Sequence, residues 1–79
     1  MGSEFLDNVK GKAIIDFGCG DGTEAIEMAQ NGAKRVVGVD IREDLLQTAR
    51  RRALAAQVER QCEFTTKTEE LADVIVSID

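Results

Sequence analysis

Four short apolar runs, rich in β-branched residues, are separated by two longer stretches in which apolar positions recur every three or four residues. A short apolar run bounded by turn residues indicates a buried strand, and the helical spacing indicates an amphipathic helix. The predicted strands are 13–17, 35–39, 61–65 and 74–78, of which the third is the weakest. The predicted helices are 23–31 and 43–57, and 67–71 is a turn or a short helical piece.

Each predicted helix carries one apolar stripe. The first stripe is Ala25, Ile26, Met28 and Ala29, and the second is Leu45, Leu46, Ala49, Ala53 and Leu54. Asp21 and Glu24 suit the start of the first helix because carboxylates there accept hydrogen bonds from free backbone amides. Gly32 suits its end. Arg50, Arg51 and Arg52 point about 100° apart around the second helix and predict a solvated face and no single basic patch.

The order strand, helix, strand, helix, strand, strand predicts an α/β fold with a parallel sheet and right-handed crossovers. The chain has 79 residues, which is at most one small domain. Residues 1–5 read Met-Gly-Ser-Glu-Phe, which two adjacent cloning sites commonly encode, so we set them aside as a cloning remnant. The domain is then expected to occupy 6–79.

Composition and charge narrow the class of protein. The 43% apolar content is too high for a disordered acidic tail, and no apolar run approaches the roughly 20 residues of a membrane span. The net charge of −5 argues against binding to nucleic acid or to anionic membranes through bulk charge. Two distant cysteines fit reduced thiols in a cytoplasmic protein better than a disulfide scaffold. We therefore expect a soluble cytoplasmic domain.

The segment 18–22, Gly-Cys-Gly-Asp-Gly, lies between a predicted strand and a predicted helix. A glycine-rich turn in that position brings backbone amides close to a nucleotide-like ligand. Asp40 ends the next strand about 20 residues later, where a carboxylate can accept hydrogen bonds from ribose hydroxyls and would repel a 2′-phosphate. An NAD-binding oxidoreductase with unusual glycine spacing is one alternative, because its fingerprint places the third glycine one residue later.

Other chemistry is not supported by the residue types present. The chain has no histidine, so Cys19 cannot form a Cys-His nucleophile, and no cluster with zinc-ligand spacing exists. We expect Cys19 to be a small filler side chain within the glycine loop. No catalytic residue and no metal site are predicted.

The chain resembles the class I S-adenosylmethionine-dependent methyltransferases. The resemblance rests on 14–22, Ile-Ile-Asp-Phe-Gly-Cys-Gly-Asp-Gly, and continues through Gly32-Ala33 and Val37-Gly38-Val39-Asp40-Ile41 into the second helix. It implies a Rossmann-like three-layer sandwich with a seven-stranded sheet, of which this chain would supply four strands. It also implies S-adenosylmethionine or S-adenosylhomocysteine as the cofactor.

The resemblance implies a role for each matching residue. Asp16 would orient the amino group of the cofactor, Asp40 would hold the ribose, and Ile41 would pack near the adenine. The glycine loop would let the backbone approach the methionine part. The full set of expected cofactor-binding residues is Asp16, Gly18, Cys19, Gly20, Gly22, Asp40, Ile41 and Asp79. Four aspartates, including Asp21, suit a cofactor that carries two positive charges.

The chain also departs from the family. Thr66-Lys67-Thr68 stands where members often have an acidic residue for the adenine, and Arg42 stands where a Ser or Thr often caps the second helix. We expect that helix start to be frayed or capped by Asp40.

With four of the seven strands, we expect this chain to be the cofactor-binding part of a methyltransferase. We expect it to be inactive alone, and the sequence does not identify a methyl acceptor. One apolar sheet face carrying Ile14, Val37 and Val76 or their neighbours would be uncovered, which favours a homodimer or partial disorder. A non-enzymatic, self-associating folding module is a further alternative.

Overall fold

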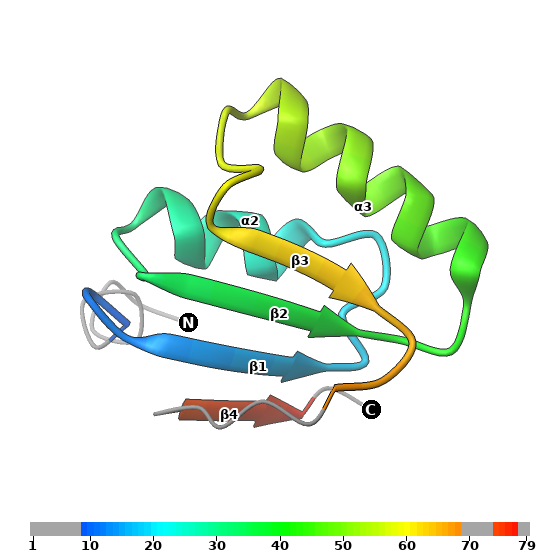
Figure 1. The fold of residues 1–79 in the computed structure, drawn as a ribbon, viewed down its shortest axis with the longest axis horizontal. Coiled ribbons are helices and arrows are strands. Elements are labelled where there is room, and N and C mark those ends of the chain that lie inside the picture. The colour runs from blue at the N-terminus through cyan, green and yellow to red at the C-terminus, as the bar shows by residue number, and fades with distance from the viewer. Residues whose placement is uncertain (1–8, 69–73, 78–79) are drawn as a thin grey trace.

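The computed structural model describes residues 9–68 and 74–77 and shows an α/β fold (Figure 1). Its elements in chain order are β1 (Ala13–Phe17), α2 (Thr23–Gln30), β2 (Arg35–Val39), α3 (Glu43–Ala55), β3 (Cys62–Thr65) and β4 (Val74–Ser77). The predicted fold class and order of elements are confirmed. Parts of the prediction lie outside the described residues. They are residues 1–5, residues 69–71 of the predicted turn, residue 78 of the last predicted strand, and Asp79 after it.

The four strands form one parallel sheet in the order β3-β2-β1-β4. Strands β1, β2 and β3 follow one another outward, whereas β4 returns to the other side of β1. The direction of the connections therefore reverses at β1. In open parallel sheets, ligands bind at such a reversal, outside the carboxyl ends of the strands. For β1 that end is Phe17, followed directly by the glycine loop.

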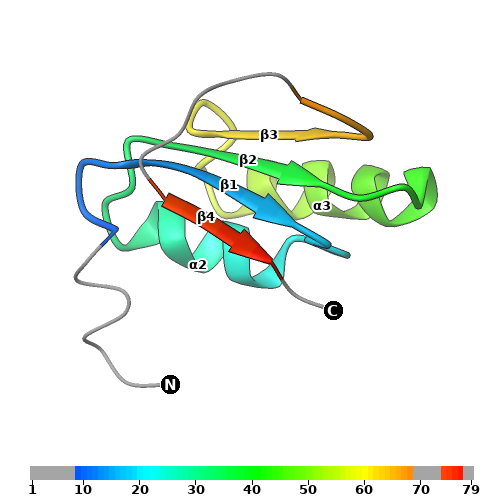
Figure 2. The ribbon, with the colours of Figure 1, turned by 90° about the horizontal axis from the view of Figure 1, so that it is seen from below.

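Both helices pack on the same face of the sheet (Figure 2). All four predicted apolar residues of α2 are buried there. In α3, Leu46, Ala49 and Ala53 are buried, but Leu54 is 62% exposed, so its place in the apolar stripe was wrong. Leu54 lies about 100° around the helix from Ala53, which is enough to turn it away from the sheet.

The opposite sheet face carries a second apolar cluster of Ile15, Val37 and Val39. The predicted uncovered face of Ile14 and Val37 is wrong, because the two side chains lie on opposite faces and each is only 1% exposed. Ile14 pairs in register with Val36, so it belongs to the helix-covered core. The side chain of Val76 lies outside the described part. In the described ranges, the helices and the sheet thus supply two of the three predicted layers.

The helix ends lie close to their predicted positions. Helix α2 ends at Gln30, one residue early, and Gly32 follows with a φ of +99°. Helix α3 ends at Ala55, two residues before the predicted Gln57. Gln57 has a φ of +63°, a left-handed conformation that ends a helix and is uncommon in residues other than glycine.

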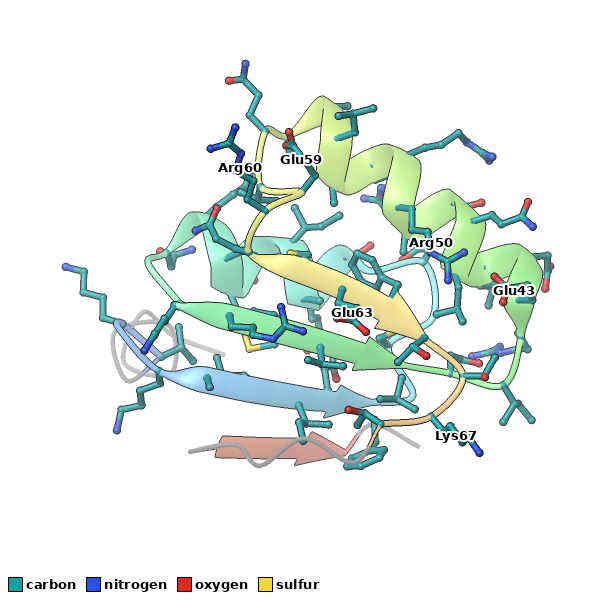
Figure 3. The ribbon with its side chains drawn as sticks, viewed as in Figure 1. Glu43, Arg50, Glu59, Arg60, Glu63 and Lys67 are labelled. Carbon is teal, nitrogen blue, oxygen red and sulfur yellow. The ribbon has the colours of Figure 1, made fainter. Side chains whose placement is uncertain are left out.

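The three consecutive arginines of α3 are all exposed, which agrees with the predicted solvated face. They have different partners, and Arg51 donates to the hydroxyl of Thr48. Arg50 lies 2.8 Å from the Glu43 carboxylate, and its Nη2 donates a hydrogen bond of 2.6 Å to the carbonyl oxygen of Phe64 (Figure 3). It therefore ties α3 to β3. Arg52 instead pairs with Asp21 in the glycine loop.

Candidate functional site

The glycine loop turns sharply between β1 and α2. Gly18, Gly20 and Gly22 have φ values of +76°, +58° and +84°, all in the left-handed region. The amides of Gly18 and Cys19 both donate to the carbonyl oxygen of Val39, over 2.7 and 3.1 Å. The loop is thus anchored to the end of β2, directly before Asp40.

Gly22 is required by close packing as well as by its backbone conformation. A Cβ on Gly22 would lie 2.8 Å from the Cβ of Ala49 and 3.1 Å from Cζ of Phe64. The same Phe64 ring lies over Gly38, where an added Cβ would be 2.6 Å from Cδ1. Real Cβ atoms do not approach other carbons so closely, so both positions need glycine. The Phe64 ring therefore packs against both the glycine loop and β2, and the loop packs closely against α3.

Asp16 is completely buried beside this loop, at 0% exposure. Strand alternation places its side chain on the helix-covered face, as for Ile14. In the described part of the chain, neither carboxylate oxygen has a hydrogen-bond partner. Burial raises the pKa of Asp16 from 3.8 to about 6, and the negative charge of Glu24 adds to the shift. A buried carboxyl without a hydrogen-bond partner is costly, so this group suits a donor or cation from outside the described part of the chain.

Asp40 is also buried, at 6% exposure, but it accepts four hydrogen bonds. The Gly20 amide donates to Oδ2 over 2.9 Å, and the Arg42 amide donates to Oδ1 over 2.9 Å. The guanidinium of Arg42 donates from Nε to Oδ1 and from Nη2 to Oδ2, over 2.9 and 2.8 Å. These bonds, chiefly those from the Arg42 side chain, hold the pKa of Asp40 well below its usual range.

Asp40 does not cap α3. Arg42 occupies the N-cap position in an extended conformation, and no side chain caps the first turn with a hydrogen bond. Of the backbone amides at this helix start, Asp40 accepts a hydrogen bond from that of Arg42, one residue before the helix begins. The capping alternative is therefore wrong, because the carboxylate also faces the glycine loop and reaches no amide of the first turn. Glu43 and Asp44 in the first turn supply negative charge that suits the helix N-terminus.

Asp21 supports the start of α2, as the sequence indicates. Its Oδ1 accepts hydrogen bonds from the amide of Thr23 over 3.2 Å and from the hydroxyl of Thr23 over 2.8 Å. Its Oδ2 lies 2.8 Å from Nη1 of Arg52. The hydrogen bonds from Thr23, followed by the charge of Arg52, lower the pKa of Asp21.

Cys19 is buried, and burial together with the charges of Asp16 and Asp40 raises the pKa of its thiol to about 12. Such a thiol is not an activated nucleophile, which agrees with its interpretation as a filler side chain. Cys19 and Cys62 are both free thiols. No group of metal-ligating side chains occurs in 9–68 and 74–77, and none of the described helices could cross a membrane.

A pocket of about 390 Å³ opens at the carboxyl ends of β1 and β2. Its lining residues are Phe17, Gly18, Val39, Asp40, Ile41 and Arg42. The volume is within the range of small-ligand sites. Ile41 lines this pocket and is 87% exposed, so it presents a large apolar surface to solvent.

Of the predicted site residues, Gly18, Asp40 and Ile41 line this pocket. Asp16, Cys19, Gly20 and Gly22 lie at the same end of β1 without lining it, and Asp79 lies outside the described residues. Sequence reasoning missed three lining residues, Phe17, Val39 and Arg42. Phe17 and Val39 were seen as strand residues within the matching motifs, with no site role. Arg42 was seen only as a poor helix cap, although a cation two residues after the carboxylate of Asp40 was a signal for an ion pair.

Comparison with known proteins agrees with this geometry. A family model described as "Methyltransferase domain" matches residues 8–79. The chain is 39% identical over 80 residues to the ribosomal protein L11 methyltransferase of Vibrio cholerae, and the alignment covers 94% of this chain and 27% of that relative. The chain thus spans about a quarter of the length of the curated relatives it matches.

Two solved structures are similar in fold and sequence. Arabidopsis thaliana protein arginine methyltransferase 10 gives a TM-score of 0.82 at 29% identity, covering 92% of this chain and 22% of that one. An RNA methyltransferase from Salinibacter ruber, in complex with S-adenosyl-L-homocysteine, gives a TM-score of 0.81 at 28% identity, covering 98% and 58%. Since the family model matches nearly all of the sequence, this chain belongs to the methyltransferase domain family.

Proposed function

We propose that this chain binds S-adenosylmethionine, and its product S-adenosylhomocysteine, as the cofactor-binding part of a methyltransferase. The observation that carries the proposal is Asp16, a fully buried carboxyl with two unpartnered oxygens beside a glycine loop. The cofactor has a primary ammonium group that can donate hydrogen bonds and offset the buried charge. A carboxyl that is costly in the free chain then becomes a binding group.

The remaining site residues fit the other parts of the cofactor. Asp40 ends β2 and is suited to accept hydrogen bonds from the ribose hydroxyls. Ile41, exposed at the mouth of the pocket, offers an apolar surface to the adenine. The left-handed glycine loop permits close approach of the methionine part. The carboxylates of Asp16 and Asp40 also suit the two positive charges of S-adenosylmethionine.

When bound, S-adenosylmethionine supplies an electrophilic methyl group. The residues of this chain would bind and orient the cofactor, and methyl transfer is proposed as the activity of the whole protein. Three similar proteins are named for different acceptors, namely a ribosomal protein, protein arginine and RNA. Because they share this segment, we infer that the choice of methyl acceptor is not made within it. No acceptor and no catalytic residue are assigned here.

The binding test compares two ligands on ¹⁵N-labelled chain. S-adenosylhomocysteine carries the ammonium group, whereas adenosine lacks the whole methionine part. Titration with either ligand should shift the amide signals of 18–22 and of Asp40. Asp16→Asn should lower the affinity for S-adenosylhomocysteine by about tenfold or more, because it removes a charged hydrogen-bond acceptor. The same variant should leave adenosine binding nearly unchanged.

Asp21→Asn is the matched control, since it removes an equal charge from the same loop at a solvent-accessible position. It should leave the affinity for both ligands within about twofold. Unmoved amides at millimolar S-adenosylhomocysteine, in a chain with a well-dispersed spectrum, would contradict the proposal. NAD displacing S-adenosylhomocysteine from the same amides at lower concentration would instead favour the oxidoreductase alternative.

Location and partners follow as part of the proposal. A cytoplasmic protein suits two free thiols, and a net charge of −5 disfavours nucleic-acid binding by this segment through bulk charge. A cofactor role for Asp79 stays a prediction. So does the homodimer, although Ile15, Val37 and Val39 are already buried and offer it no open apolar face. Sedimentation at two chain concentrations tests it, because a dimer at millimolar concentration would be twice the mass of the monomer.

A further inference from the structure

The carboxylate of Asp40 has no acceptor site left for a ligand. Two carboxylate oxygens offer about four lone-pair sites. All four are used within the chain, by the amides of Gly20 and Arg42 and by Nε and Nη2 of Arg42. Ribose hydroxyls can bind Asp40 only if some of these donors leave.

The four donors differ in how easily they can leave. The amides of Gly20 and Arg42 are part of the backbone and are fixed by the glycine loop and by the approach to α3. The Arg42 side chain is 58% exposed, and in the described part of the chain the printed hydrogen bonds of its guanidinium go to Asp40. The guanidinium is therefore the donor that can leave without moving the backbone, and because it forms a bidentate pair with a buried carboxylate, its displacement takes a share of the ligand's binding energy.

The guanidinium also lies where a ligand would enter. Nη2 of Arg42 is 4.0 Å from the position of a Cβ added to Gly20, and Arg42 lines the pocket together with Asp40 and Ile41. Asp44, two residues farther along, also acts on Arg42 by its negative charge, so a displaced guanidinium has a second carboxylate within reach.

We propose that Arg42 occupies the ribose subsite in the free chain, donating to Asp40 in place of the two ribose hydroxyls, and must swing away when a ribose-bearing ligand binds. Arg42 is thus an affinity-determining residue that competes with the ribose diol for the oxygens of Asp40. The inference rests on the proposed function, because it takes Asp40 as the ribose acceptor.

The test uses adenosine and 2′,3′-dideoxyadenosine, which lacks both hydroxyls. Dissociation constants come from the amide shifts of Gly20 and Asp40 in the chain and in Arg42→Gln, whose shorter side chain cannot form the fork. Arg42→Gln should bind adenosine more tightly, by about fivefold or more, because the ligand no longer has to displace a bidentate guanidinium from a buried carboxylate. Its affinity for dideoxyadenosine should be unchanged.

Arg52→Gln is the control, because the Arg52 side chain is also exposed, at 44% against 58% for Arg42, and it pairs with Asp21 in the glycine loop instead of with Asp40. It should leave both affinities unchanged. Three outcomes would overturn the inference: an equal gain in adenosine affinity in Arg52→Gln, an equal gain in dideoxyadenosine affinity in Arg42→Gln, or no gain in adenosine affinity in Arg42→Gln. The proposed function would still be supported in each case if the wild-type chain binds the ligands. Unmoved amides in every variant, with S-adenosylhomocysteine as well as adenosine, would overturn the proposed function itself.

Discussion

Asp16 and Asp40 stand at the carboxyl ends of neighbouring strands, and both are buried, yet their surroundings are opposite. Asp16 has no hydrogen-bond partner in the described chain, and burial raises its pKa to about 6. Asp40 has four donors, led by Arg42, and its pKa lies well below the usual range. Two identical side chains in one site therefore hold different charge states near pH 6, because partners rather than residue type decide which form is stable.

The difference also separates two kinds of binding group. A ligand donor that reaches Asp16 forms a hydrogen bond where none existed and relieves a cost of the free chain. A donor that reaches Asp40 replaces one already present, so its net gain is smaller. The methionine side of the proposed site should thus supply more affinity than the ribose side. Changes to the loop, to each carboxylate and to an exposed ion pair test this asymmetry.

Gly22→Ala should disrupt the surroundings of both Asp16 and Asp40, because it displaces the glycine loop that lies beside them. The added Cβ would clash with Ala49 and Phe64, in a backbone conformation with φ of +84°. Overpacking and left-handed strain together should cost about 4 kcal/mol of unfolding free energy, measured by urea denaturation. Gly11→Ala is the control, since Gly11 has a φ of +70° with nothing within 4 Å of the added Cβ. Equal losses in both variants would show that the clash is relieved at no cost.

Asp16→Asn should stabilise the chain at neutral pH. The folded pKa of Asp16 is about 6 against 3.8, so the folded state binds the proton more tightly. Stability from this group is complete below pH 4 and is lost as the pH rises through 6. The advantage of Asp16→Asn over the wild type should grow to about 3 kcal/mol between pH 4 and pH 7. Urea denaturation at each pH measures it, and a constant difference would contradict the raised pKa.

Asp40→Asn should show the opposite pH dependence. Its lowered pKa means that Asp40 contributes stability above pH 4, which is lost as the pH falls below the unfolded value of 3.8. At pH 7 the variant should be about 1–2 kcal/mol less stable, because the charged acceptor of Gly20 and Arg42 is removed. The deficit should shrink toward pH 3. If the stability deficit of the variant grew on acidification, the negative charge of Asp40 would not be the source of its stabilising effect.

Arg52→Gln should have the smallest effect. Its pair with Asp21 is exposed, so its loss should cost about 0.5 kcal/mol or less in low salt. In about 0.5 M salt the variant and the wild type should unfold at the same urea concentration, because screening already removes the interaction. A larger loss that persists in salt would show that Arg52 supports the loop by packing.

Much of the fold was predictable because local signals agreed. The β-branched runs fixed β1 and β2 at their observed bounds, and the spacing of Ala25, Ile26, Met28 and Ala29 identified the buried side of α2. The glycine loop and Asp40 were located by spacing alone. Each of these features depends on residues close together in the chain.

What escaped the sequence depends on contacts across the sheet. The face of Ile14 could not be assigned without the register that pairs it with Val36. The lack of partners around Asp16 and the full set around Asp40 depend on which side chains converge in space. Leu54 was assigned to the core because it is apolar, although its angle around α3 turns it to solvent.

The ring of Phe64 lies on two glycines, Gly38 in β2 and Gly22 in the loop. Neither glycine can gain a side chain while the ring is present, and loss of the ring would leave a void above both. Positions 22, 38 and 64 should therefore change together in evolution, because residues in contact covary. An added Cβ at 38 would also lie 2.8 Å from Sγ of Cys19. A larger residue at 38 therefore becomes admissible in a homologue whose residues at 19 and 64 are both smaller, and with it a different shape of the cofactor loop.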